Sequence, residues 1–121
     1  MHPSHHLGKK GEDIAVKWLT RNGYRILERR WRWKHMEIDI IATKNNMLVI
    51  VEVKSRSSAQ HADPDDTLSK RQQRHLFDIT DHYMEVKRTE MEVRYDLIVV
   101  IDHGETHSIE HIEEAFYPFM S

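Results

Sequence analysis

Cysteine is absent from this 121-residue chain, and so are long apolar segments. Without cysteine, the chain can form neither a disulfide nor a zinc or iron–sulfur site built from thiolates. No uninterrupted apolar run exceeds the five residues of Met47–Val51, whereas a membrane-spanning helix needs about 20. The first residues lead into no apolar stretch of the kind found in a secretory signal. We therefore expect one cytoplasmic domain over residues 1–121, without membrane contact and with residues 1–6 as a mobile end.

The net charge of -2 conceals an uneven distribution of charged side chains. Residues 1–60 carry 12 Lys and Arg against 6 Asp and Glu, whereas residues 61–121 carry 6 against 14. Such an asymmetry allows a nearly neutral protein to present a basic face to a polyanion, because the local field matters more than the total charge. Alternatively, folding mixes the two halves and no basic patch survives. The acidic half is also compatible with a protein-interaction domain.

Hydrophobic periodicity predicts helices and strands in the order α-β-β-β-α-β-β. Helices are expected over residues 7–22 and 68–86, the second capped by Asp65, Asp66 or Thr67. Extended segments are expected over residues 24–33, 36–43, 47–54, 93–101 and 107–112, with a loop over residues 55–66. This order predicts an α/β domain whose helices pack on a mixed β-sheet.

The two central strands carry the most informative residues. Asn45 and Asn46 suit a two-residue hairpin loop, since asparagine tolerates a positive φ. With that loop, Asp39 falls opposite Glu52, and Glu37 falls opposite Lys54. A three-residue loop would instead place a valine opposite Asp39, so the register is a specific prediction.

Two carboxylates facing each other on neighbouring strands destabilise a sheet unless something compensates their charge. Mg²⁺ or Mn²⁺ would do so, because these cations prefer carboxylate and water oxygens. Lys54 projects to the same face as Glu52 and would lie beside a metal-bound water. Alternatively, this is an ordinary hairpin whose polar residues meet solvent and in which Glu37 and Lys54 form a cross-strand ion pair.

The pattern resembles the YraN family, which is related to Holliday-junction resolvases within the PD-(D/E)XK nuclease superfamily. The similarity extends from about Gly8 to Phe116. The matching residues are Gly8, Gly11-Glu12, Ala15, Gly23-Tyr24, Glu37-Ile38-Asp39, Val51-Glu52-Val53-Lys54, Arg56, Lys70, Arg94-Tyr95-Asp96, Ile109, His111-Ile112 and Ala115-Phe116. Met36 departs from the pattern, because the family often has glycine there.

The resemblance implies a restriction-endonuclease-like fold, a mixed sheet of about five strands flanked by helices. It also implies that Asp39, Glu52 and the Val53 carbonyl bind Mg²⁺ or Mn²⁺, with Glu12 completing the site directly or through water. Lys54 would activate or orient the attacking water. Glu37 matches the pattern, but its expected partner is Lys54 rather than a metal.

The function implied by the resemblance is metal-dependent hydrolysis of DNA phosphodiester bonds, selective for branched or otherwise structured DNA, in repair or recombination. A homodimer would suit cleavage of two strands. The alternative is a nuclease-fold module that binds nucleic acid without catalytic turnover.

A basic segment precedes the hairpin and is expected to contact phosphates. Arg30, Arg32 and Lys34 share one face of an extended strand, while Trp31 and Trp33 share the other. Further cations are predicted to join this nucleic-acid surface: Arg56, Lys70, Arg71 and Arg74. Alternatively, the strand is a charged edge strand that resists aggregation, with both tryptophans in the core. Among the ten histidines, His103, His107 and His111 recur every four residues, but their segment contains Gly104 and is predicted to be turn and strand rather than helix, so no histidine metal site is expected.

Overall fold

The structure is a computed structural model that describes residues 3–57 and 68–118. Its elements follow the predicted order. They are α1 (Pro3–Arg21), β1 (Arg25–Trp33), β2 (Met36–Lys44), β3 (Met47–Ser57), α3 (Lys70–Lys87), β4 (Glu92–Asp102) and β5 (His107–Phe116).

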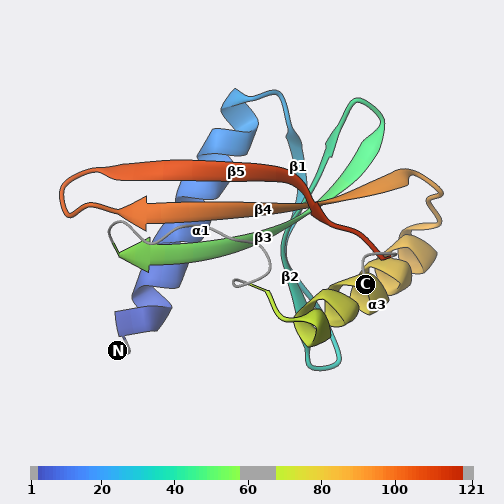
Figure 1. Cartoon of the computed structure of the whole chain (residues 1–121). Helices are drawn as coiled ribbons and strands as arrows, with labels where there is room; N and C mark the ends of the chain where they lie inside the picture. The colour runs from blue at the N-terminus through green and yellow to red at the C-terminus, as the bar shows by residue number, and fades with distance from the viewer. Residues whose placement is uncertain (1–2, 58–67, 119–121) are drawn as a thin grey trace.

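The five strands form one twisted sheet in the order β1-β2-β3-β4-β5 (Figure 1). Neighbouring strands are antiparallel except β3 and β4, which are parallel. Parallel neighbours need a crossover connection, and the segment containing α3 supplies it between these two strands. The predicted mixed sheet with flanking helices is therefore confirmed.

Each face of the sheet is covered by one helix. On β3, Val49 and Val51 pack into the cluster under α1, whereas Leu48 and Ile50 pack into the cluster under α3. A strand that is apolar on both faces is expected for the centre of a covered sheet. Trp31 and Trp33 are half-buried against the α3-side cluster, as the core interpretation of the tryptophans predicts.

The boundaries of several elements differ from the sequence prediction. The first helix begins at Pro3, and the last two strands extend to Asp102 and Phe116. The predicted cap of the second helix was wrong. Its N-cap is Ser69, whose hydroxyl accepts a hydrogen bond from Gln72 N–H while the Gln72 side chain accepts one from Ser69 N–H. This reciprocal pairing satisfies two backbone donors; residues 58–67 lie outside the described part of the chain.

Two tight turns join the first three strands. Asn45 and Asn46 have φ values of 51° and 64°, which confirms the two-residue loop and fixes the β2–β3 register. In the β1–β2 turn Lys34 has a φ of 57°. A lysine therefore adopts a left-handed conformation that glycine would adopt without strain.

Helix α1 approaches β3 closely at Gly11. A Cβ atom placed on Gly11 would lie 2.2 Å from the Ser55 hydroxyl oxygen, so only glycine fits without displacing that side chain. The close approach also brings Glu12, the next residue, against the sheet. Among the helices of the described residues, none has both the length and the apolar character that crossing a bilayer requires.

The contact predicts a coupling between Gly11 and Ser55. In a helix, Gly→Ala normally stabilises by roughly 0.5–1 kcal/mol. We expect Gly11→Ala to lose this gain, or to destabilise, in the wild-type background, and to recover it in a Ser55→Ala background. Urea unfolding of the four proteins of this cycle measures the effect. A stabilisation of equal size in both backgrounds would contradict the close contact.

Candidate active site at a fork in the sheet

Strands β2 and β3 part at the residues singled out by the sequence. The β2–β3 ladder runs from Lys44↔Met47 to Ile40↔Val51 and, in the described residues, extends no further. Beyond that point β2 pairs only with β1, and β3 pairs only with β4. The sheet therefore forks just beyond the Ile40–Val51 pair. Asp39 on β2 and Glu52 on β3 are the next residues, level with each other as the predicted register requires.

Strand β2 changes faces at the fork. Ile38 and Ile40 would share one face of a regular strand, yet Ile38 packs on the α3 side and Ile40 on the α1 side. Asp39 lies at this switch, and its carboxylate accepts a hydrogen bond of 2.8 Å from Val53 N–H. On β1, Arg30 stands at the same level and has a φ of 51°. The local twist thus turns Asp39 toward the gap between the strands.

The Asp39 and Glu52 carboxyl groups meet in the fork, where the negative charge of Asp39 opposes the ionisation of Glu52. Burial raises the pKa of Asp39, although hydrogen bonds with Glu52 and Val53 N–H limit the rise. Burial raises the pKa of Glu52 well above its usual range, and the neighbouring negative charge of Asp39 raises it further. Of the two groups, Glu52 is therefore the one whose ionisation the site opposes more strongly.

Lys54 lies beside this pair, with its Nζ 3.7 Å from Glu52 Oε1. Its positive charge lowers the pKa of Glu52, but less than burial and Asp39 raise it. Glu37 does not meet Lys54, contrary to the sequence-based expectation, because the strands have already separated at that level. Glu37 instead pairs with Arg32, its neighbour across β1 and β2.

Glu12 reaches the fork from α1 and lies in an arginine clamp. Its carboxylate oxygens lie 3.1 Å from Arg29 Nη2 and 3.0 Å from Arg30 Nε. The carboxylate is buried and its negative charge raises the pKa of Asp39. Glu12 is thus close enough to influence the acid pair, but in this structure it binds two guanidinium groups.

The donor set at the fork suits a hard divalent cation in part. Asp39 and Glu52 supply two carboxyl groups whose mutual repulsion a cation would relieve. Over residues 3–57 and 68–118, no cluster of three or more Asp, Glu or His side chains is arranged to hold a metal ion. A third protein carboxylate at the fork would require Glu12 to leave the arginines.

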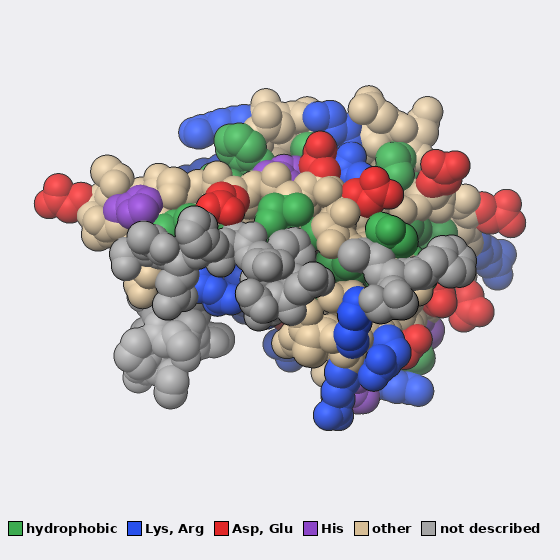
Figure 2. Space-filling view, in the orientation of Figure 1, with side chains coloured by type: hydrophobic (Ala, Val, Ile, Leu, Met, Phe, Trp, Pro, Cys, Tyr) green, Lys and Arg blue, Asp and Glu red, His purple; other side chains and the backbone are tan. Residues whose placement is uncertain are grey.

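The cations predicted to contact nucleic acid divide into two groups. Arg30 and Arg32 bind carboxylates, as described above, and Arg56 hydrogen-bonds to the Ser55 carbonyl. Others are exposed: Lys34 in the β1–β2 turn, and Lys70, Arg71 and Arg74 at the start of α3. Figure 2 shows Lys and Arg side chains gathered at the lower edge, where Figure 1 places this turn and the start of α3.

Sequence reasoning missed two histidines beside the fork. A hollow of about 160 Å³ opens next to Glu52 and is lined on its far side by His35 and His75. Their rings meet edge to face with centroids 5.3 Å apart. His35 comes from the β1–β2 turn and His75 from α3, so no local spacing in the sequence could have paired them.

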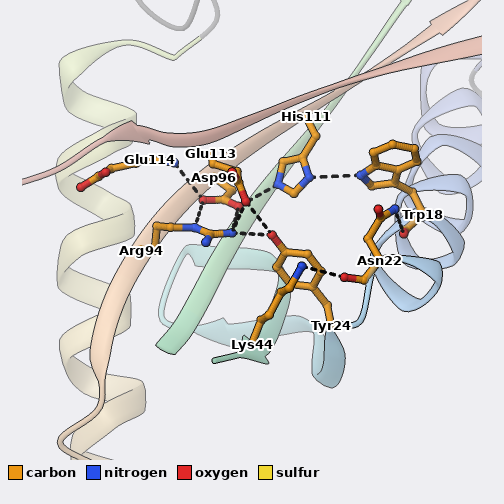
Figure 3. A network of polar contacts seen from close by, with 9 residues as sticks. All are labelled: Trp18, Asn22, Tyr24, Lys44, Arg94, Asp96, His111, Glu113 and Glu114. Atoms are coloured by element: carbon orange, nitrogen blue, oxygen red, sulfur yellow. Dashed lines mark hydrogen bonds and ion pairs between the residues drawn. The ribbon is translucent and has the colours of Figure 1, made fainter. Parts of the chain in front are cut away.

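A second polar network supports the sheet near the fork, on the face that α1 covers (Figure 3). The fully buried carboxylate of Asp96 accepts hydrogen bonds from the Arg94 guanidinium, from Glu114 N–H and from His111 Nε2, the last at 2.7 Å. His111 Nδ1 accepts from the Trp18 indole N–H, which fixes the neutral tautomer with its proton on Nε2. Burial alone would raise the pKa of Asp96, but these hydrogen bonds outweigh it and hold the pKa below its usual value.

The Asp96 network joins segments that are far apart in the sequence. The Arg94 guanidinium also bonds to the Tyr24 hydroxyl and lies 3.2 Å from Glu113 Oε1. Asp96 pairs with Val51, the residue just before Glu52. The network therefore joins α1, the α1–β1 connection, β4 and β5 beside β3, the strand that carries half of the acid pair.

Comparison with known proteins places this α/β fold with its forked sheet in a family. A family model described as "Uncharacterised protein family UPF0102" matches residues 11–100. A UPF0102 protein of Bacteroides fragilis is 46% identical over 112 residues, covering 93% of each chain. A UPF0102 protein of Flavobacterium johnsoniae is 40% identical over 117 residues, covering 93% of this chain and 95% of the relative.

By its fold and its site, the chain is an α/β protein with paired acids at the centre of a mixed sheet. It belongs to the UPF0102 family, also known as the YraN family. The matched region contains Glu12, Asp39, Glu52, Lys54 and Asp96, so the fork and most of its support lie within it.

The acid pair predicts that Glu52→Gln stabilises the protein at neutral pH. Glu52 has a folded-state pKa raised above the unfolded value, so its contribution to stability is greatest below the unfolded pKa of about 4.3 and is lost as pH rises through the folded pKa. Removing the ionisable group should therefore raise the free energy of unfolding by about 2 kcal/mol at pH 7, with the gain vanishing near pH 4. Urea unfolding at both pH values, with exposed Glu110→Gln as the control, measures this. Destabilisation at pH 7 would show that the pair is not strained.

The opposite pH dependence is expected for Asp96→Asn. The Asp96 carboxylate has a lowered folded pKa, so its stabilisation is present above the unfolded pKa of about 3.9 and is lost as pH falls toward the folded value. Leaving Arg94 without its buried partner should cost about 3 kcal/mol at pH 7, and this cost should shrink below pH 4. Chemical unfolding from pH 7 to 3.5 measures the difference from wild type. A cost that stays constant over that range would exclude a charged Asp96.

Proposed function

We propose that this protein hydrolyses phosphodiester bonds of DNA, with a divalent cation bound by Asp39 and Glu52. The observation that carries the proposal is the meeting of these two carboxyl groups in a fork of the sheet, with the Lys54 ammonium beside them. Two buried acids held against their own repulsion destabilise the fold, and such strain is typical of functional sites. The resemblance to the PD-(D/E)XK nucleases supports the same assignment.

The residues of the chain have separate roles in this proposal. A bound Mg²⁺ or Mn²⁺ would neutralise phosphate charge and lower the pKa of a water molecule. Asp39 would bind the cation in the orientation that Val53 N–H imposes on its carboxylate. Glu52 would bind it through its ionised carboxylate, a form that the charge of the cation would favour. Lys54 would orient the water and offset the negative charge that develops on the phosphate oxygens.

The exposed cations provide a phosphate-binding surface next to this site. Lys70 and Arg71 lie in the first turn of α3, where the helix dipole disfavours positive side chains and where there is no acidic residue. Among the described residues neither cation pairs with a carboxylate, and an external anion, here the phosphate backbone, would stabilise both. The cations of this surface are placed to contact phosphates rather than base edges, so selection by DNA structure, including branched DNA, is the proposed mode.

One observation favours a second candidate, a nucleic-acid-binding module without turnover. Glu12 is bound by Arg29 and Arg30 rather than directed to the acid pair. A protein that keeps this clamp closed would bind DNA through its cations but would lack a third acid at the fork. Cation binding distinguishes the two candidates, because only the enzyme requires it.

The direct test is incubation of the protein with branched, single-stranded and linear DNA in Mg²⁺ or Mn²⁺. We expect cleavage that Asp39→Asn reduces at least about a hundredfold, with Lys54→Met giving a loss of similar size. Glu110→Gln, an exposed acid on β5, is the matched control and should cleave normally. DNA binding without cleavage of any substrate would favour the binding module.

Thermal unfolding with added Mn²⁺ tests the cation site without relying on activity. A ligand that binds only the folded state raises Tm with its concentration. We expect this rise in the wild type and its loss in Asp39→Asn. An equal rise in both proteins would place the cation elsewhere.

A further inference from the structure

A second, larger hollow adjoins the one beside Glu52. It has a volume of about 520 Å³ and lies between the β1–β2 turn and the exposed side of α3. Because His35, Met36 and His75 line both hollows, a ligand can extend from the acid pair into the larger space. We call this second hollow the base hollow. Its other lining residues are Trp33, Lys34, Asp78, Asp81, His82 and Glu85.

One wall of the base hollow is aromatic. Trp33 and His82 are stacked with ring centroids 4.0 Å apart and planes 12° from parallel. Both side chains are only half-buried. The Lys34 ammonium lies over the Trp33 ring, 4.5 Å from its centroid, so a base that stacks on Trp33 takes the place of this exposed side chain. Flat π-surfaces of this kind bind nucleobases irrespective of sequence, because every base has a π-face.

The other wall carries carboxylates, and these restrict what can enter. Asp78, Asp81 and Glu85 are exposed along α3 from its middle to its last turn, whereas Lys70, Arg71 and Arg74 occupy its start. A phosphate is attracted to the first half of the helix and repelled from the second. A nucleobase is uncharged, and carboxylate oxygens accept hydrogen bonds from the exocyclic amino groups of bases.

We propose that the base hollow holds one unpaired nucleobase carrying an exocyclic amino group, turned out of the nucleic-acid strand whose phosphate lies at the Asp39–Glu52 fork. This inference rests on the proposed function and adds a substrate preference to it: DNA with an unpaired nucleotide next to the bond that is cut. The volume lies within the roughly 300–1,000 Å³ typical of small-ligand sites. Extrusion is easiest where a base is already unpaired.

The base preference is tested by binding, without divalent cations and at constant salt. Two DNA duplexes carry 2-aminopurine, one with the probe base paired to thymine and one with it in a single-nucleotide bulge. We expect the wild type to bind the bulged duplex about tenfold more tightly, with a change in probe fluorescence that the paired duplex does not give. Equal affinities with no fluorescence difference would overturn the inference.

Substitutions then locate the preference in the molecule. Bulged cytosine should bind more tightly than bulged thymine, since only cytosine presents an amino group, and Asp78→Asn/Asp81→Asn should abolish this difference. Glu105→Gln/Glu110→Gln removes the same charge from exposed positions in the β4–β5 turn and on β5, the edge strand farthest from β1, and should keep the difference. A preference for cytosine that survives in the first variant would place base selection elsewhere.

The outcomes separate this inference from the proposed function. Cleavage of DNA with no preference for an unpaired base would overturn the base hollow alone. Selective binding of the bulged duplex with no cleavage in Mg²⁺ or Mn²⁺ would overturn the enzyme assignment alone. A lysine-rich peptide that binds the wild type but not Asp78→Asn/Asp81→Asn, in a protein indifferent to bulges, would assign the hollow to a basic peptide instead.

Discussion

The repulsion between the Asp39 and Glu52 carboxyl groups is the interaction on which the candidate site depends. Burial favours the neutral form of both groups, and the charge of Asp39 further favours the neutral form of Glu52; the surrounding sheet holds the two groups together despite this cost. The β2–β3 ladder holds both strands up to Ile40 and Val51. Beyond that point, each strand is held by its other neighbour. The Val53 N–H, which a continued β2–β3 ladder would have paired with a backbone carbonyl, donates instead to the Asp39 carboxylate.

The support for this arrangement comes from the face opposite to the basic surface. Asp96 and Arg94 form a buried, fully hydrogen-bonded ion pair beside Val51. A buried carboxylate with several donors contributes rigidity when every partner is satisfied. Among the described residues, no buried side-chain nitrogen or oxygen lacks a hydrogen-bond partner. The strain of the fork is thus offset by a well-satisfied network nearby.

The sequence predicted the elements whose determinants are local. Asn45 and Asn46 determined the loop, the loop determined the register, and the register placed Asp39 level with Glu52. The sequence could not predict that the ladder would end there, because the divergence arises from a twist shared by β1 and β2. Because of that twist, Arg30 pairs with Glu12 and Glu37 pairs with Arg32. The alternation of side chains along a single strand does not indicate these partners. The contact of His35 with His75 likewise depends on how α3 crosses the sheet.

The short hairpin between the two acids also bears on the order of folding. Only a small loop has to close before Asp39 and Glu52 become neighbours, and closing such a loop is fast and costs little entropy. Strand β4 and helix α3 arrive from further along the chain, and they bring the burial that makes the two charges costly. We therefore expect the carboxyl groups to come together while they are still hydrated, and the cost of burying them to arise late, when the parallel strand docks.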